Sequence, residues 1–334
     1  MNGEGTDRTT VTTDHTNDAA DTPSTDEAQR HHVRTAGVVI GYDGSPESRL
    51  ALSWAAATAR RRGIRLTLLH SVNLSFIPGF PAFDTSAMEP ELQDAAKRLV
   101  DDGAMRAGDT LDASRIQTQY WLGSPAAQLV EMSSDADLVV VGSRGRGRLL
   151  AGLLGSTSYA VAAHAHCPVV VVRGPEGKTP DDIPAPPRPG RGHDVVVGID
   201  DSDAAKRAVD AAVEVAEREH AVLHIVRVAH SRSMEAWTYA ETAKGGTEET
   251  HAIRDNAEQS VLRAADRVRA QHPKVIVTTE VLYGDPGQSL ADLGATAGMI
   301  VVGSRGHGGF TGMLLGSVSH RAIHDAACPV MVVR

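Results

Sequence analysis

The chain has 334 residues, of which 22% are charged and 41% hydrophobic, so it is long enough for two domains with apolar cores. Its net charge of −9, without a strongly basic domain, argues against nucleic-acid binding. Two cysteines exclude a disulfide framework and a cysteine-rich zinc module, and no apolar run reaches the roughly 18 residues that span a bilayer. No basic and then apolar stretch stands at the beginning of the chain, so we expect no signal peptide. We therefore expect a soluble, cytoplasmic protein that does not bind membranes.

The chain divides into four parts. Residues 1–35 hold nine threonines and no aromatic residue, which predicts a disordered tail. This tail is interpreted as a solvated leader, with a phosphorylatable regulatory segment as the alternative. Residues 174–193 contain six prolines and are predicted to form a linker. Residues 36–173 and 194–334 are predicted to form two domains.

The two predicted domains repeat one another. Ala136–Gly145 reads ADLVVVGSRG and Ala297–Gly306 reads AGMIVVGSRG, 161 residues later. Cys167–Val172 (CPVVVV) and Cys328–Val333 (CPVMVV) have the same separation. The first strands, VVIGYD and VVVGID, lie 157 residues apart. Because the repeated unit has the size of a domain, the pattern indicates a duplication.

Each copy alternates strand and helix patterns. In the first copy, short apolar runs predict strands buried in a parallel sheet at residues 37–42, 66–72, 137–141 and 168–172, with a weaker strand at 115–122. Ser45-Pro46-Glu47 is a typical helix start, and Ser202 opens the matching helix. This alternation predicts doubly wound α/β domains, in which ligands bind at the carboxyl ends of the strands.

A glycine pattern follows the fourth predicted strand of each copy. Gly142-Ser143-Arg144-Gly145 is followed, after nine residues, by Gly155-Ser156, and Gly303-Ser304-Arg305-Gly306 by Gly316-Ser317. Glycines leave backbone amides uncovered, and the start of a helix favours anions. The pattern therefore predicts a phosphate cradle in each copy.

With these features the chain resembles the ATP-binding branch of the universal stress protein family. The matching motifs are GYDGS and GIDDS, VVVGSRG and IVVGSRG, LGS, and the terminal CPVVVVR and CPVMVVR. The resemblance covers roughly residues 35–173 and 194–334. It implies two tandem Rossmann-like domains of the adenine-nucleotide alpha-hydrolase type. Each would have a five-stranded parallel sheet in the order 3-2-1-4-5, and the domains would pair through strand five.

The resemblance also implies one ATP site per domain. Asp43 and Asp200 would lie near the ribose or adenine, and Val72 and Val228 would meet adenine through backbone groups. The glycines and first helix serines would hold phosphate, with Ser158 and Ser319 as further hydroxyl donors. The full predicted sets are Gly41, Asp43, Val72, Val141, Gly142, Arg144, Gly145, Gly155, Ser156, Thr157 and Ser158, and Gly198, Asp200, Val228, Val302, Gly303, Arg305, Gly306, Gly316, Ser317, Val318 and Ser319.

The two predicted sites differ in charge. Gly44 of the first copy becomes Asp201 in the second, which adds a negative charge. Arg146 and Arg148 become His307 and Gly309, which removes two positive charges at neutral pH. We therefore expect the first site to bind ATP more tightly.

The expected function depends on the phosphate cradle and on whether catalytic residues accompany it. The loop has no P-loop lysine, so we expect a nucleotide-responsive regulator without efficient turnover, with ATP bound with or without Mg²⁺. The resemblance implies that this regulator acts in stress adaptation or dormancy. The alternatives are a slow ATPase or autokinase, and an interaction module with vestigial sites.

His164-Ala165-His166 is interpreted as a helix end rather than a metal site, and both cysteines as buried apolar residues. Homodimerisation and the identity of a protein partner stay open.

Overall fold

The computed structural model describes residues 34–72, 89–145, 154–174, 189–190, 193–229, 248–306 and 315–334. The predicted tail up to residue 33, most of the predicted linker, and positions 146, 148, 307 and 309 lie outside these ranges. Thr35, which we assigned to the tail, is bonded to the first domain. Its hydroxyl donates to Asp135 at 2.5 Å and its backbone N–H donates to the same carboxylate at 3.0 Å.

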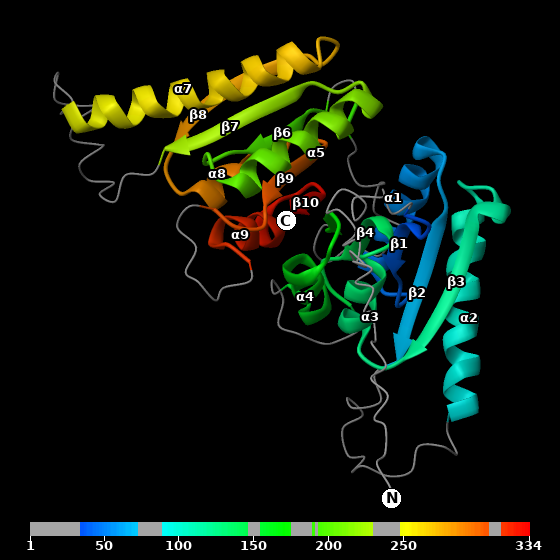
Figure 1. Ribbon diagram of the computed structural model, residues 1–334. Helices are drawn as coiled ribbons and strands as arrows, with labels where there is room; N and C mark the ends of the chain where they lie inside the picture. Colours follow the sequence, from blue (N-terminus) through cyan, green and yellow to red (C-terminus); the bar gives the residue numbers. More distant parts are fainter. Residues whose placement is uncertain are drawn as a thin grey trace, which may run out of the picture. The chain divides into compact units, whose positions relative to one another are not determined.

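The first domain alternates strands and helices along the chain (Figure 1). Its elements are β1 (Gly37–Gly41), α1 (Pro46–Arg62), β2 (Leu66–Val72), α2 (Glu89–Gly108), a short 3-10 turn (Ala113–Arg115), β3 (Ile116–Leu122), α3 (Pro125–Met132), β4 (Ala136–Gly142), α4 (Ser156–His164) and β5 (Val169–Val172). The four predicted apolar strands and the weaker one are all present, with ends that shift by one residue at most.

The second domain repeats this order. Its elements are β6 (Val195–Gly198), α5 (Asp203–Glu219), β7 (Leu223–Ala229), α7 (Glu248–Gln271), β8 (Val277–Tyr283), α8 (Pro286–Leu293), β9 (Met299–Gly303), α9 (Ser317–Asp325) and β10 (Val330–Val333). Figure 1 shows α7 lying along β7 and β8. None of the helices in the described ranges is long and apolar enough to cross a membrane.

The described strands form one sheet in the order β3-β2-β1-β4-β5-β10-β9-β6-β7-β8. Within each domain all neighbouring strands are parallel, and the strand order is 3-2-1-4-5. The expected α/β fold is therefore confirmed. The domains meet through an antiparallel pair, β5 with β10, in which Val170 faces Met331. This pairing covers two strand edges that would otherwise expose unpaired backbone groups.

Local sequence signals determine where the first helix of each domain begins and ends. The Ser45 side chain caps α1 by accepting from the Ser48 N–H at 3.2 Å, and Pro46 occupies the first turn. Gly63 ends the helix with φ of +68°, a conformation that glycine adopts without steric cost. In the second domain Ser202 caps α5 in the same way, with the Ala205 N–H as donor at 3.1 Å. The predicted helix starts are thus present.

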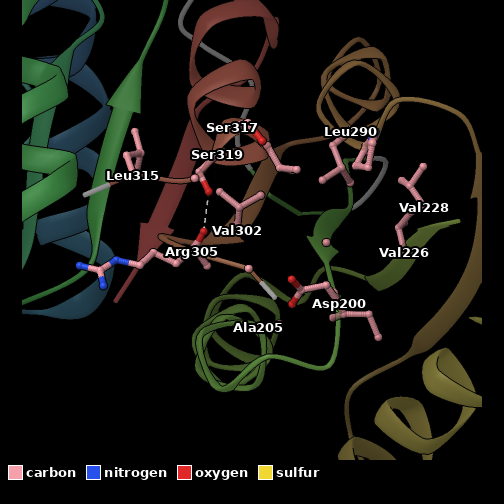
Figure 2. A pocket seen from close by; sticks show the side chains of 17 residues that line it. Asp200, Ala205, Val226, Val228, Leu290, Val302, Arg305, Leu315, Ser317 and Ser319 are labelled. Carbon is pink, nitrogen blue, oxygen red and sulfur yellow. Dashed lines mark hydrogen bonds between the residues drawn. The ribbon is translucent and has the colours of Figure 1, made fainter. Parts of the chain in front are cut away.

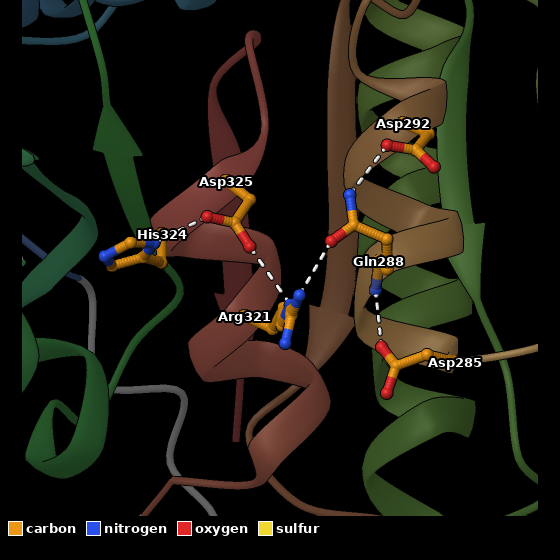
Figure 3. A network of polar contacts seen from close by, with 6 residues as sticks. All are labelled: Asp285, Gln288, Asp292, Arg321, His324 and Asp325. Atoms are coloured by element: carbon orange, nitrogen blue, oxygen red, sulfur yellow. Dashed lines mark hydrogen bonds and ion pairs between the residues drawn. The ribbon is translucent and has the colours of Figure 1, made fainter. Parts of the chain in front are cut away.

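A polar network joins α8 to α9 (Figure 3). The Arg321 guanidinium donates to the Gln288 side-chain oxygen at 2.8 Å and pairs with Asp325 at 3.1 Å. Gln288 donates onward from its amide group to Asp292 at 2.8 Å. His324 hydrogen bonds to Asp325 and lowers the pKa of that carboxyl. The network fixes α9, the helix that follows the second glycine loop.

Candidate functional site

Each domain has a cavity at the carboxyl ends of its parallel strands, where an open α/β sheet binds ligands. The first has a volume of about 380 Å³ and is lined by Gly41, Tyr42, Asp43, Ser48, Leu69, His70, Ser71, Pro125, Leu129, Val141, Gly142, Arg144, Gly145, Gly155, Ser156, Thr157 and Ser158. The second, shown in Figure 2, measures about 460 Å³ and is lined by Gly198, Ile199, Asp200, Ala205, Val226, Val228, Pro286, Leu290, Val302, Gly303, Arg305, Gly306, Leu315, Gly316, Ser317, Val318 and Ser319.

The structure brings the predicted residues together around these cavities, with one exception. Val72 does not line the first cavity, and its carbonyl accepts from the Gly123 N–H at 2.9 Å. The register of the strands shows why: β2 begins at Leu66 as β7 begins at Leu223, so Ser71 is the counterpart of Val228. Val72 was expected to offer backbone groups to adenine, but it lies one residue beyond the position of Val228 and its carbonyl is already bonded to Gly123.

Sequence reasoning missed the apolar floor of both cavities. Leu129 of α3 and Leu290 of α8 lie under the ends of the first strands. A Cβ at Gly41 would lie 2.9 Å from the Leu129 side chain, and one at Gly198 would lie 2.6 Å from Leu290. The glycine at the strand end therefore makes room for the leucine. The repeated Gly-x-Pro that precedes α3 and α8 was the available signal.

The first glycine of each loop allows a helix to pack against the strand end. A Cβ at Gly142 would lie 2.9 Å from the Glu47 backbone carbon, and one at Gly303 would lie 2.9 Å from that of Ala204. Glu47 and Ala204 belong to the first turns of α1 and α5. The start of each helix is thereby held against the beginning of the glycine loop.

The second glycine of each loop lies against an acidic side chain. A Cβ at Gly145 would lie 2.7 Å from a carboxylate oxygen of Asp43, and Gly306 faces Asp200 in the same way. The other carboxylate oxygen of Asp43 accepts from the Ser45 N–H at 2.9 Å, and that of Asp200 from the Ser202 N–H at 3.1 Å. Both aspartates are thus positioned at the cavity edge, as Figure 2 shows for Asp200.

The helices that start at the cavities lack side-chain caps. Gly155 and Gly316 are the N-cap residues of α4 and α9, and neither helix has a side-chain cap hydrogen bond. Their own N–H groups bond back to the loop, at 2.8 Å to the Ser143 carbonyl and 2.7 Å to the Ser304 carbonyl. The N–H groups of the first helical turn have no partner within a helix. The residues that carry them line the cavities: Ser156 and Thr157 in the first domain, and Ser317 and Val318 in the second. Such donors, with the helix dipole, favour an anion.

Two predicted hydroxyl donors have a different role. Ser158 is buried and donates to the Gly142 carbonyl at 2.6 Å, and Ser319 donates to the Gly303 carbonyl at 2.5 Å. Figure 2 shows Ser319 directed at the strand end. A serine has a single hydroxyl proton, so neither side chain can donate to a phosphate in this arrangement. They tie the helix start to the strand end instead.

Asp201 also differs from its predicted role. It does not line the second cavity, and its carboxylate accepts from Arg227 and, at 2.5 Å, from Ser260. Burial raises the pKa of Asp201, but these hydrogen bonds outweigh burial, so the pKa is lowered overall. The ion pair offsets the added negative charge. The expected weakness of the second site then depends on Arg146 and Arg148, which the structure does not describe.

The two cysteines are buried, as predicted, and burial raises the pKa of each thiol to about 12. His164 and His166 are exposed beside Cys167. In the described part of the chain, no group of three or more histidines, cysteines, aspartates or glutamates could hold a metal ion.

Comparisons with known proteins agree with this architecture. The model of the universal stress protein family matches residues 37–173 and again 193–334. A universal stress protein of Mycobacterium tuberculosis is 35% identical over 303 residues, which cover 89% of this chain and 97% of that protein. Another from the same organism is 33% identical over 309 residues, with 89% and 96% covered. A crystal structure of a universal stress protein from Archaeoglobus fulgidus aligns with a TM-score of 0.63 at 21% identity, over 91% of this chain and 97% of that one.

Proposed function

This chain belongs to the universal stress protein family, and from that premise we propose that each domain binds one adenine nucleotide, preferably ATP. The family membership assigns the chain a role in the stress response. Binding would regulate the protein rather than supply a fast reaction. A ligand at 100 times its dissociation constant stabilises the bound form by about 2.7 kcal/mol per site, which is comparable to ordinary gaps between conformations.

The observation that carries the proposal is that the two helices starting at the cavities, α4 and α9, have no side-chain cap. α1, α3, α5 and α8 all have a serine or aspartate N-cap whose side chain accepts from a first-turn N–H. α4 and α9, which start at the cavities, have glycine instead. Serine or aspartate at an N-cap is preferred over glycine for helix stability. Leaving these N–H groups open makes sense where a phosphate would accept from them.

The rest of each cavity suits a nucleoside. The carboxylates of Asp43 and Asp200 only accept hydrogen bonds, so they match ribose hydroxyls. The apolar floor at Leu129 and Leu290 offers a surface for a base. Both cavity volumes, about 380 and 460 Å³, fall within the range of roughly 300–1,000 Å³ usual for small-molecule sites.

The slow ATPase or autokinase remains the second candidate because Ser156 and Ser317 are exposed at the helix starts. Ser158 and Ser319 are poorer acceptors of a phosphoryl group, since each hydroxyl is buried and bonded to a carbonyl. The two candidates differ in the nucleotide that the protein should retain.

The test is to denature the purified chain and quantify the released nucleotides by chromatography and mass spectrometry. Close to two ATP per chain supports the proposal with slow turnover, whereas mostly ADP favours the ATPase. A chain carrying both Gly155→Asp and Gly316→Asp should release none. If the native chain also releases none and then fails to bind ATP in a millimolar titration, the proposal is wrong and an interaction module is the better explanation.

A further inference from the structure

The arginine of the glycine loop has an acidic partner in the first domain. The Arg144 Nε lies 3.2 Å from a carboxylate oxygen of Glu47, and the two side chains are only 22% and 17% exposed. Glu47 follows Pro46 in the first turn of α1, which packs against Gly142. A partly buried carboxylate therefore offsets the positive charge of Arg144 beside the phosphate cradle, and water screens this pair less than an exposed one.

The second domain lacks this partner. Ala204 occupies the place of Glu47, since Gly303 approaches Ala204 as Gly142 approaches Glu47. Arg305 lines the second cavity and is exposed. It makes no ion pair with any residue in the ranges that the structure describes. Figure 2 shows its guanidinium extended away from Asp200, which leaves it available to an anionic ligand.

The remaining charges near the two cavities balance. Asp43 and Asp200 occupy equivalent positions, so they contribute equally. The second domain has two extra acids beside the start of α5, and both are paired: Asp201 with Arg227 and Asp203 with Lys206. Among the described residues, Glu47 is thus the charge that distinguishes the two cradles.

We propose that Glu47 makes the two nucleotide sites unequal in their response to phosphate charge. The first site binds adenine nucleotides with little preference for a long phosphate chain, and the second selects ATP over AMP through Arg305. The inference rests on the proposed nucleotide binding. From the sequence we expected the first site to attract phosphate charge more strongly, whereas we infer here that the second site does. The contact between Glu47 and Arg144, which the sequence did not predict, is the reason for the difference.

The experiment compares two chains that each keep one site. Gly306→Trp leaves the first site and Gly145→Trp leaves the second, and Gly316→Asp and Gly155→Asp provide a second pair if tryptophan prevents folding. Calorimetric titration gives the ratio of ATP to AMP affinity for each chain. We expect this ratio to be roughly three- to tenfold higher at the second site, the effect of one nearby charge on a polyphosphate at physiological salt.

Moving the glutamate from the first site to the second should reverse which site prefers ATP over AMP. Glu47→Gln should raise the ratio at the first site toward that of the second, and Ala204→Glu should lower it at the second. Because Ala204 is only 7% exposed, Arg305→Gln provides an independent way to lower the second ratio. Glu258→Gln removes a glutamate from another arginine pair, on α7, and should leave both ratios unchanged.

Two results would overturn the inference. If both nucleotides bind but the two ratios are equal, or Glu47→Gln leaves the first ratio unchanged, Glu47 does not set the preference and the proposed function stands. If the unmodified chain binds neither nucleotide, the proposed function fails, and this inference fails with it.

Discussion

The two loop glycines of each domain differ in what a side chain would meet. At Gly142 a Cβ would lie 2.9 Å from backbone atoms of α1, which cannot move without shifting the helix. At Gly145 it would meet the end of the Asp43 side chain, which can rotate. We expect Gly142→Ala to lower the free energy of unfolding by about 2 kcal/mol, as overpacking does. Gly145→Ala should cost less than about 1 kcal/mol but weaken ATP binding, because Asp43 must leave its place.

Urea unfolding and ATP titration of the same variants separate these effects. Gly108→Ala is the matched control, because a Cβ there would meet nothing within 4 Å. It should be neutral or slightly stabilising, since alanine favours a helix more than glycine does. Equal destabilisation by Gly142→Ala and Gly145→Ala would contradict the distinction between backbone and side-chain neighbours.

The buried cysteines predict a pH dependence. Burial raises the pKa of Cys167 and Cys328 from 9.0 to about 12, so the folded chain keeps two protons that the unfolded chain releases between these values. The unfolded state then binds fewer protons, and the free energy of unfolding should fall as pH rises through this window, by up to about 1.4 kcal/mol per pH unit for each thiol. Urea unfolding between pH 8 and 10, compared with a Cys167→Ala, Cys328→Ala chain, measures the effect.

The same burial should protect the thiols chemically. At pH 8 a disulfide reagent should leave both unmodified in the folded chain and label two thiols per chain in urea. Fast labelling of the folded chain would show that the thiols are accessible.

Residues also mark where prediction from the sequence ends. The glycines, the strand ends and Asp43 could be predicted because their roles are local or repeated in both copies. The partners of Arg144 and Asp201 could not, because Glu47 and Ser260 come from distant parts of the chain. Val72 does not line the first cavity because the strand register aligns Ser71, and not Val72, with Val228, and strand register depends on contacts between strands.

At the scale of elements, the uncapped helices predict a conflict between stability and binding. Gly155 has φ of −63° and ψ of 142°, ordinary for a capping aspartate, and its Cβ would meet no atom closer than 3.4 Å. Gly155→Asp should therefore raise the free energy of unfolding by a few tenths of a kcal/mol, through the cap and the helix dipole. It should also weaken ATP binding at least tenfold, because a carboxylate would occupy the place of a phosphate.

Gly155→Ser is the control for charge, because serine also caps a helix but carries no charge. It should match aspartate in stability and weaken binding less. Thermal unfolding and titration with the second site blocked give both quantities. A gain in ATP affinity with aspartate at this position would exclude a phosphate at the start of α4.

The helix starts at Ser45 and Ser202 and the buried strands could be predicted because capping and apolar runs are local signals. The strand order could be predicted only from the family resemblance, because the sequence of one strand does not indicate which strands pair with it. The floor of each cavity required the packing of α3 and α8 under the sheet. That arrangement depends on contacts between elements, so the sequence of a single element does not predict it.

At the scale of the whole molecule, the shared sheet predicts cooperative unfolding. β5 and β10 are buried along their full lengths, and one apolar cluster includes Trp54 and Val170 of the first domain and Val215 and Met331 of the second. Neither domain can then unfold without exposing the apolar edge strand of the other. Scanning calorimetry should show one transition whose calorimetric and van't Hoff enthalpies agree.

Met331→Lys tests the cause of this cooperativity. It places a cation opposite Val170, in a position that is 2% exposed. Arg61, Arg62 and Arg218 line the same small cavity and would repel it. The one acid among the described residues that line this cavity, Glu219, is already paired with Arg61. Burial of an unpaired charge costs several kcal/mol, so the pairing of β5 with β10 should open before either domain unfolds completely. We expect the single transition to split in two, with the second domain unfolding first because it carries the substitution. Two transitions already present in the unmodified chain would mean that the domains are stable without their shared edge.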